Sequence, residues 1–271
     1  MAKQHMMLLF GSFNPVHRGH TALAEYAIEQ GLCDAVAMII SPQNPFKQNM
    51  ALASEMDRYA MVEAACKATR YPEQIHASVV EFLLEKPSYT INTLRYLQEN
   101  NGHEMRFSIL MGSDLINTLP EWREAEEIIQ GYDIYVYPRP GVEMTYKTPR
   151  TTFLADAPQC DFSSTDVRHR LESGDDVSRM LTRDVVKYIR ERDLWSIEGK
   201  IDRLSLQIEE QPTASLYLER GKCYYRRNEW GKAINDFRHA ELLDKECIEA
   251  EQFRKMTEEI LEYRYKDIYN P

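Results

Sequence analysis

Near its amino terminus the chain reads Leu8-Leu9-Phe10-Gly11-Ser12-Phe13-Asn14-Pro15-Val16-His17-Arg18-Gly19-His20. The apolar run at residues 6–10 predicts a short buried strand, and residues 11–15 predict a tight loop. Residues 21–30 have the periodicity of a helix. The stretch therefore predicts a strand, a loop and a helix, with two histidines where the helix begins.

This arrangement is suited to holding an anion. Gly11 lets the backbone approach a ligand closely, and the free N–H groups at the start of a helix favour phosphate oxygens. His17 and His20 are three residues apart, so both can face one point, and Gly19 leaves the inner side of the turn open. The alternative interpretation is that both histidines are core or cap residues.

The composition excludes several classes of protein. The chain is 43% hydrophobic and 28% charged, as in soluble globular proteins, and its net charge of −10 argues against nucleic acid or an anionic membrane as the main partner. The five cysteines are scattered and never form a CxxC pair, which is typical of reduced thiols. The sequence has no signal-peptide pattern and no apolar run near the ~20 residues of a membrane span. We therefore expect a cytoplasmic protein.

Up to about residue 196, short apolar runs alternate with amphipathic stretches. Strands are predicted at residues 6–10, 35–40, 75–77, 107–111 and 134–137, and helices at residues 21–30, 55–68, 90–100 and 121–129. The alternation predicts an α/β fold with a doubly wound, Rossmann-like and mostly parallel sheet, whose ligands lie beyond the carboxyl ends of the strands. We assign residues 1–196 to this domain.

Several side chains near these strand ends and helix starts have two interpretations. Lys47 ends a proline-rich loop and can approach a phosphate or remain a solvated lysine, and the role of Arg58 stays open. Thr90 starts a predicted helix, where it can cap or contact a substrate. Asp114 follows a strand and can bind a ribose or cap a helix. Trp122 can cover the core or stack on a heteroaromatic ring.

A second stretch with anion-binding character reads Phe162-Ser163-Ser164-Thr165-Asp166-Val167-Arg168. Its three consecutive hydroxyls precede a predicted helix, and Arg168 lies one turn into that helix. Hydroxyls, free N–H groups and a guanidinium together suit a polyanion. An ordinary Ser or Thr cap with Asp166 in the first turn is the alternative. Two anion sites at two helix starts suggest a long phosphate chain.

The segment at residues 197–271 is a different kind of domain. It is predicted to be helical, with breaks at residues 211–213 and 228–230. Seven positions resemble a tetratricopeptide repeat: Tyr217, Gly221, Tyr224, Trp230, Ala233, Phe237 and Ala240. Arg220, Asn228 and Lys245 depart from that pattern. A single repeat cannot bury its apolar face, so we expect support from helices near residues 197–210 and 246–265. Such a domain can bind a protein partner, self-associate, or only stabilise the chain.

These motifs identify a family. The first 196 residues or so resemble bacterial nicotinate-nucleotide adenylyltransferases, which belong to the HxGH nucleotidyltransferase superfamily. The resemblance is carried, in family order, by residues 11–15, His17-Arg18-Gly19-His20, Asn44-Pro45-Phe46-Lys47, Arg58, Ser88-Tyr89-Thr90-Ile91-Asn92-Thr93-Leu94, Met111-Gly112-Ser113-Asp114, Trp122 and residues 163–168. Phe10 replaces a usual glycine and Asn92 a usual aspartate, and the helical tail is absent from the usual enzyme.

The resemblance implies that ATP and nicotinate mononucleotide give nicotinate adenine dinucleotide and pyrophosphate, by in-line attack without a covalent intermediate. His17 and His20 would bind the ATP phosphates and stabilise the transition state, with Lys47 on the phosphate chain. The remaining assignments are Ser164, Thr165 and Arg168 to the leaving pyrophosphate, Gly112 and Asp114 to the ribose, Gly11, Ser12 and Phe13 to ATP, and Asn14, Thr90 and Trp122 to the mononucleotide. Mg²⁺ is expected on the ATP phosphates, without a protein cage.

Two other functions stay open. A related adenylyltransferase would use nicotinamide mononucleotide or phosphopantetheine as the acceptor. The alternative outside the enzymes is a non-catalytic interaction protein whose nucleotide-binding fold has lost its activity. The intact His17, His20 and Arg168 argue against it. The sequence does not predict the choice between acid and amide mononucleotide, the oligomeric state, the partner of the tail or regulation by the product.

Overall fold

The computed structural model describes residues 3–42 and 52–268. The chain folds into two compact units, one of residues 1–167 and 177–188 and the other of residues 168–176 and 189–271. The division falls within two helices, α6 (Ser164–Glu172) and α7 (Arg183–Glu191). Lys47 lies outside the described residues.

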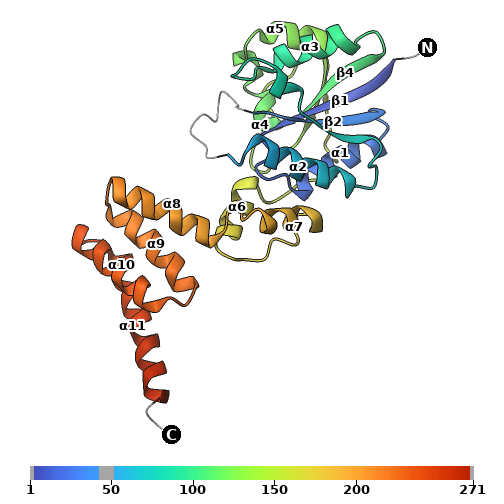
Figure 1. Ribbon diagram of the computed structural model, residues 1–271. Helices are drawn as coiled ribbons and strands as arrows, with labels where there is room; N and C mark the ends of the chain where they lie inside the picture. The colour runs from blue at the N-terminus through green and yellow to red at the C-terminus, as the bar shows by residue number, and fades with distance from the viewer. Residues whose placement is uncertain (1–2, 43–51, 269–271) are drawn as a thin grey trace. The chain divides into compact units, whose positions relative to one another are not determined.

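A parallel sheet forms the centre of the first unit (Figure 1). Its six described strands are β1 (Gln4–Gly11), β2 (Ala35–Ile40), β3 (Ile75–Ser78), β4 (Met105–Gly112), β5 (Asp133–Tyr137) and β6 (Thr151–Phe153). Their order is β3-β2-β1-β4-β5-β6, and every neighbouring pair is parallel. The strand order reverses beside β1, which is where ligands bind in doubly wound folds. The predicted fold class is confirmed.

Helices cover both faces of this sheet, which explains why the central strands are almost continuously apolar. On one face lie α1 (Arg18–Glu29) and α2 (Glu55–Lys67), and on the other α3 (Thr90–Asn101) and α5 (Ala125–Gly131), as Figure 1 shows. Leu8 and Ile109 of the sheet pack with Leu94 of α3 and Ile128 of α5 in one buried cluster. All six residues of β2 are buried.

The sequence did not predict every element of the first unit. The helix expected at residues 121–129 is wrong at its start, because α5 begins only at Ala125. Before it, a 3₁₀ turn, η3 (Leu119–Glu121), ends at Trp122, whose backbone is extended. Glu124 between them has a φ of 52°. Four further elements were also missed: the helix α7, the strand β6, the single-turn helix α4 (Ser113–Ile116) and the 3₁₀ turn η2 (Val80–Leu83).

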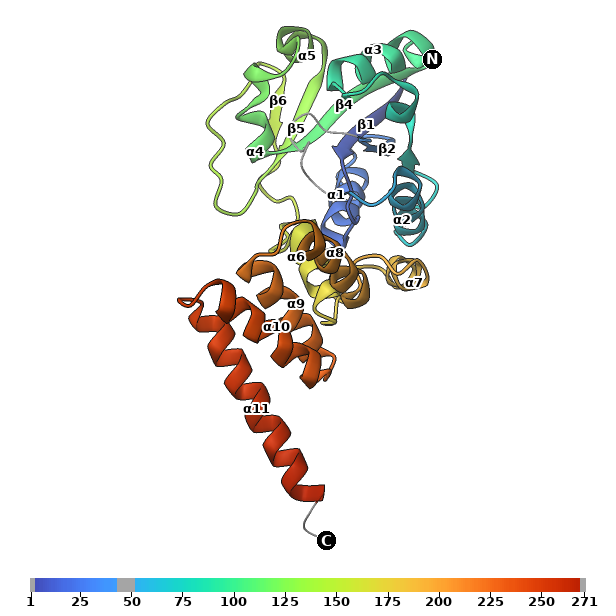
Figure 2. The same ribbon diagram turned by 60° about the vertical axis from the view of Figure 1, so that its left-hand side comes forward.

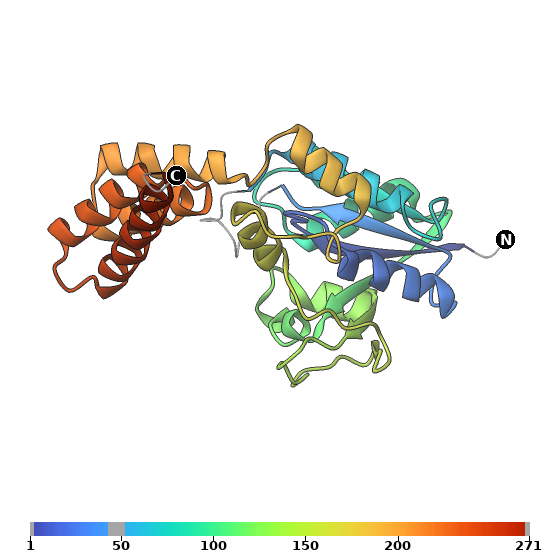
Figure 3. The same cartoon turned by 90° about the horizontal axis from the view of Figure 1, so that it is seen from below.

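The second unit is helical, with α8 (Ile197–Glu210), α9 (Ala214–Arg226), α10 (Trp230–Leu243) and α11 (Ile248–Ile268). Figures 2 and 3 show α9 and α10 side by side with α11 packed on them, mainly on α10, and Figure 2 shows α11 continuing past their ends. Gly221 of α9 lets the ring of Phe237 approach closely, because a Cβ there would lie 2.6 Å from Cε1 of Phe237. Arg220 donates to both carboxylate oxygens of the buried Asp236, at 2.8 Å each. Arg220, a departure from the repeat pattern, thus crosslinks the helix pair.

Among the described residues, no helix combines the length and the apolar character that crossing a membrane requires.

Candidate functional site

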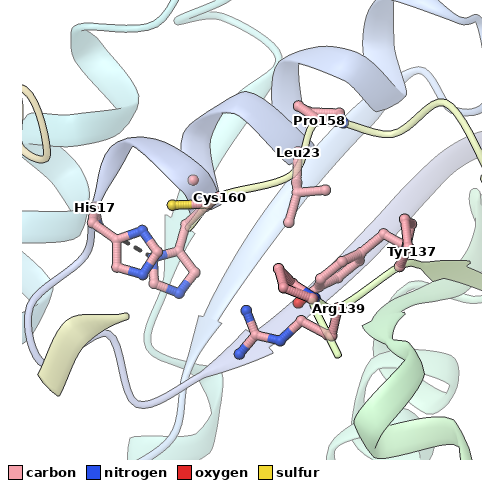
Figure 4. A pocket seen from close by; sticks show the side chains of 10 residues that line it. His17, Leu23, Tyr137, Arg139, Pro158 and Cys160 are labelled. Carbon is pink, nitrogen blue, oxygen red and sulfur yellow. Dashed lines mark hydrogen bonds between the residues drawn. The ribbon is translucent and has the colours of Figure 1, made fainter. Parts of the chain in front are cut away.

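Three neighbouring strands bring their carboxyl ends to one edge of the sheet. The loop after β1 leads to His17, the turn after β4 carries Asp114, and the segment after β5 carries Arg139. A pocket at this edge is lined by His17 and His20 at the start of α1, by Arg139 and by Cys160 (Figure 4). Sequence analysis predicted the histidines and Asp114 at this edge and did not predict Arg139.

The two imidazole rings pack on each other at the start of α1. Extended backbone at His17 begins the helix, and the His17 backbone N–H donates to Nδ1 of His20 over 3.1 Å. The ring centroids lie 3.7 Å apart, with an interplanar angle of 31°. Because Nδ1 of His20 accepts this hydrogen bond, a neutral His20 ring carries its proton on Nε2. Backbone and ring geometry thus fix the orientation of His20.

His17 is a buried imidazole with an unused nitrogen. Its side chain is 6% exposed, and its Nδ1 atom makes no hydrogen bond with the described residues. Burial, and to a lesser degree the positive charge of Arg139, lower the pKa of His17 to about 4, and Asp166 acts in the opposite direction. His17 is therefore neutral at pH 7 in the free protein, and an anion beside it would favour protonation.

Both the backbone and the side chain of Arg139 have polar partners that hold the residue in place. Its N–H donates to the hydroxyl of Ser113 over 3.0 Å, and its Nε lies 3.6 Å from Oδ1 of Asp114. Figure 4 shows its guanidinium extending toward His17. A guanidinium and two imidazoles at one pocket can together neutralise the oxygens of a polyphosphate.

Asp114 does not cap a helix, so that interpretation is wrong. The cap residue of α4 is Gly112, and Asp114 lies in the first turn, where its buried Oδ1 faces Arg139 at ion-pair distance. A Cβ at Gly112 would lie 2.3 Å from that same oxygen and 2.9 Å from Cγ of Arg139. A side chain at residue 112 would therefore displace the Asp114 carboxylate or the Arg139 side chain from this pair.

Gly19 also lies in close contact with residues that line the pocket. A Cβ at this residue would lie 2.8 Å from Cβ of Cys160 and 3.0 Å from Nδ1 of His17. The segment that carries Cys160 therefore packs directly on the first turn of α1. The predicted open inner side of the turn is occupied by Cys160 and by the imidazole of His17.

Arg58, left open by the sequence, crosslinks the loops beside the histidines. Its side chain is 1% exposed and donates to the carbonyls of Ser12, Ser41, Pro42 and Ala53. The amide oxygen of Asn14 accepts from the backbone N–H of Ala53 over 2.9 Å. Both side chains hold the loop after β1 to the segment that starts α2. Phe13 lies within this loop with a φ of 46°, and its ring packs 3.0 Å from where a Cβ of Gly11 would lie.

The hydroxyl stretch begins α6 as a capped helix. The backbone N–H of Asp166 donates to the hydroxyl of Ser163 over 3.3 Å, and the N–H and hydroxyl of Ser163 donate to the Asp166 carboxylate over 2.7 and 2.6 Å. The interpretation of a Ser cap with Asp166 in the first turn is therefore confirmed. The hydroxyl of Ser164 donates to the carbonyl of Pro15 over 2.9 Å, which ties α6 to the loop before His17. Arg168 belongs to the second unit. Phosphate binding by Ser164, Thr165 and Arg168 stays a prediction.

A second group of predicted residues surrounds the start of α3. Thr90 is the first residue of α3, and Tyr89 before it packs on the same buried cluster as Trp122. The guanidinium of Arg123 lies 4.8 Å from the ring centroid of Tyr89, which joins the two segments. Nε1 of Trp122 donates to the hydroxyl of Thr118 over 3.2 Å and so fixes the indole. A half-buried indole beside a helix start can hold a flat ring that carries an anionic group.

The described side chains offer no cluster of three or more His, Cys, Asp or Glu that could hold a metal ion.

Comparison with known proteins gives the class first. Residues 8–170 match the cytidylyltransferase-like family. A Plasmodium falciparum nicotinic acid mononucleotide adenylyltransferase complexed with NaAD has the same fold, with a TM-score of 0.60 at 16% identity over 71% of this chain and 97% of that one. The parallel sheet, the two paired histidines and the family match together define an α/β protein of the nucleotidyltransferase type.

Curated relatives narrow this class. A protein of Cytophaga hutchinsonii is 34% identical over 190 residues, 70% of this chain and 97% of the relative. One of Bacteroides thetaiotaomicron is 40% identical over 182 residues, 67% of this chain and 88% of the relative. Both are named as probable nicotinate-nucleotide adenylyltransferases. The chain belongs to the nicotinate-nucleotide adenylyltransferase family, which confirms the resemblance seen in the sequence.

Proposed function

We propose that this protein transfers AMP from ATP to nicotinate mononucleotide, forming nicotinate adenine dinucleotide and pyrophosphate. Membership of the nicotinate-nucleotide adenylyltransferase family supports this reaction. The observation that carries the proposal is the pocket that joins His17 and His20 at the start of α1 to Arg139 after β5. Three side chains able to donate to phosphate oxygens converge there.

The chemistry is an in-line displacement. A phosphate oxygen of the mononucleotide forms a bond to the α-phosphorus of ATP, while the bond from that phosphorus to the bridging oxygen of pyrophosphate breaks. Negative charge gathers on the equatorial and leaving oxygens, so positioning and charge neutralisation supply most of the acceleration. We assign this neutralisation to His17, His20 and Arg139, assisted by Lys47, Ser164, Thr165 and Arg168 on the phosphate chain.

The acceptor would bind between the start of α3 and Trp122. The indole is fixed by its hydrogen bond to Thr118, so it can stack on the pyridine ring at little entropic cost. Thr90 and the positive end of the helix dipole at the start of α3 favour an anionic ring substituent. This geometry supports the acid mononucleotide as the acceptor.

Mg²⁺ would reach the site on the phosphate oxygens of ATP. The two imidazoles and the guanidinium, with no cluster of three or more His, Cys, Asp or Glu among the described residues, suit an anionic ligand better than a cage for a hard cation. When bound, the ion would neutralise further charge on the phosphates.

The helical unit α8–α11 would bind a protein partner or a second copy of this chain. Its repeat-like helix pair, α9 and α10, supports such an interaction role.

The test is a panel of acceptors with ATP and Mg²⁺: nicotinate mononucleotide, nicotinamide mononucleotide and phosphopantetheine. We expect the highest kcat/KM with nicotinate mononucleotide, with dinucleotide and pyrophosphate formed in equal amounts. Turnover of phosphopantetheine alone would replace the proposal with a different adenylyltransferase. Absence of turnover with all three acceptors would favour a non-catalytic protein.

A further inference from the structure

Glu81 is a buried carboxyl that the proposed chemistry does not use. It lies in η2, between β3 and α3, and is 1% exposed. Among the described residues, no cation lies within ion-pair distance of its oxygens, and burial raises its pKa above the usual value, opposed by the hydroxyls of Ser41, Thr93 and Ser88. A buried ionised carboxylate without a cation is costly, so the neutral acid is the form this environment favours.

The surroundings of Glu81 lead to the start of α3. Thr93, in the first turns of that helix and fully buried, donates its hydroxyl to Oε1 of Glu81 over 2.9 Å. Ser88, two residues before Thr90, is also buried, and its hydroxyl is near the carboxyl without an aligned hydrogen bond. Oε2 of Glu81 is likewise buried without an aligned partner among the described residues. Two buried polar atoms near the start of α3, Oγ of Ser88 and Oε2 of Glu81, therefore have no aligned hydrogen-bond partner among the described residues.

The same carboxyl also reaches the end of β2. Ser41 follows the last residue of β2, and its carbonyl accepts a hydrogen bond from Arg58 over 2.6 Å. Glu81 thus lies where the end of β2, the segment before α3 and the first turns of α3 meet. A neutral acid has one O–H donor and a carbonyl acceptor, so it can accept from the hydroxyl of Thr93 and donate to a neighbouring hydroxyl.

We infer that Glu81 is a positioning residue for the pyridine mononucleotide, a neutral buried acid whose hydrogen bond with Thr93 holds the start of α3 so that Thr90 faces the ring. The inference rests on the proposed function and deepens it. Glu81 would touch neither substrate, and its effect would pass through the start of α3. An ionised Glu81 would also place a negative charge behind the helix start and oppose an anionic ring.

The experiment compares two substitutions at one residue. Glu81→Gln keeps the shape, the acceptor oxygen and a donor, whereas Glu81→Met keeps only the approximate volume. We expect Glu81→Gln to keep KM for nicotinate mononucleotide within about twofold of the wild type, since a neutral acid and an amide are nearly equivalent here. Glu81→Met should raise that KM about tenfold or more, with KM for ATP and kcat at saturation little changed. Glu85→Met, at an exposed residue of the same segment, is the matched control and should change neither KM.

Three results would overturn the inference. Glu81→Gln as impaired as Glu81→Met would mean that the ionised carboxylate is needed. Equal rises in both KM values would mean a general structural role, and an unchanged KM in Glu81→Met would remove the residue from substrate binding. If Glu81→Met does not fold, Thr93→Val replaces only the hydroxyl by a methyl group and should raise KM for the mononucleotide alone. A wild-type protein that makes no dinucleotide overturns the proposed function, and the inference with it, whereas an active wild type with these variant results overturns the inference alone.

Discussion

The buried His17 makes the stability of the protein depend on pH in a predictable direction. Its pKa is about 4 in the folded protein, against 6.5 for an ordinary histidine. Above pH 6.5 the ring is neutral in both states and contributes nothing. Below pH 6.5 the unfolded chain binds a proton that the folded protein does not, so stability falls as pH falls, down to about pH 4.

The magnitude follows from the width of this window. Each pH unit inside it costs about 1.4 kcal/mol, so His17 should remove about 2 kcal/mol between pH 6.5 and pH 5 and about 3 kcal/mol over the whole window. His17→Asn removes the titrating ring and keeps a side chain that suits the first position of a helix. The variant should therefore lose about 2 kcal/mol less than the wild type on going to pH 5.

The assay is urea unfolding of the wild type and His17→Asn at pH 7.5 and pH 5.0. The double difference cancels every other titrating group that the two proteins share. A direct NMR titration of the His17 ring should have its midpoint near pH 4, and Arg139→Gln should move that midpoint upward because it removes a nearby positive charge. Equal losses of stability in both proteins, or a ring midpoint near 6.5, would refute the burial argument.

Three substitutions test the packing that holds the site and the helical unit, each by a different measurement. Gly19→Ala should lower kcat about tenfold or more, because its Cβ would meet Cys160 and Nδ1 of His17, whereas Gly131→Ala, with open space around it, should keep wild-type turnover. Wild-type turnover by Gly19→Ala would show that catalysis does not depend on the observed position of His17. Gly221→Ala should cost about 1–3 kcal/mol in thermal unfolding followed by circular dichroism, since Phe237 lies 2.6 Å from the new Cβ, while Gly231→Ala should be neutral or stabilising. A neutral Gly221→Ala would contradict the close packing of α9 on α10. Arg58→Met should cost at least about 3 kcal/mol in denaturant unfolding because four carbonyls lose a charged donor, and a loss below about 1 kcal/mol would contradict its crosslinking role.

The central fold could be predicted because its signals are local. Parallel strands buried on both faces are continuous apolar runs, as β2 shows, and the helices between them repeat their apolar residues with helical period. The strand β6 was missed because it is three residues long and partly exposed, so it has no apolar run to detect. The break at Trp122 depends on a 3₁₀ turn and a left-handed Glu124, which residue periodicity does not encode.

The site could be predicted only where its residues share a local motif. His17 and His20 lie on one helix turn, so their spacing alone predicts that they meet. Arg139 joins them from a segment more than a hundred residues away, and only the sheet order that puts β5 two strands from β1 brings it there. Its one sequence signal is its position directly after a predicted strand in the same sheet. Arg58 was ambiguous because a buried arginine that binds carbonyls and one that binds a phosphate have the same sequence context.

The central claim is that imidazoles at the start of α1 stabilise the transfer of AMP between ATP and nicotinate mononucleotide. The most direct measurement is the rate of nicotinate adenine dinucleotide formation by His20→Ala and by the wild type, with both substrates saturating. Removing one donor to a developing charge costs on the order of a hundredfold or more in kcat, so we expect that loss with an unchanged circular dichroism spectrum. Wild-type turnover in a folded His20→Ala protein would contradict the claim.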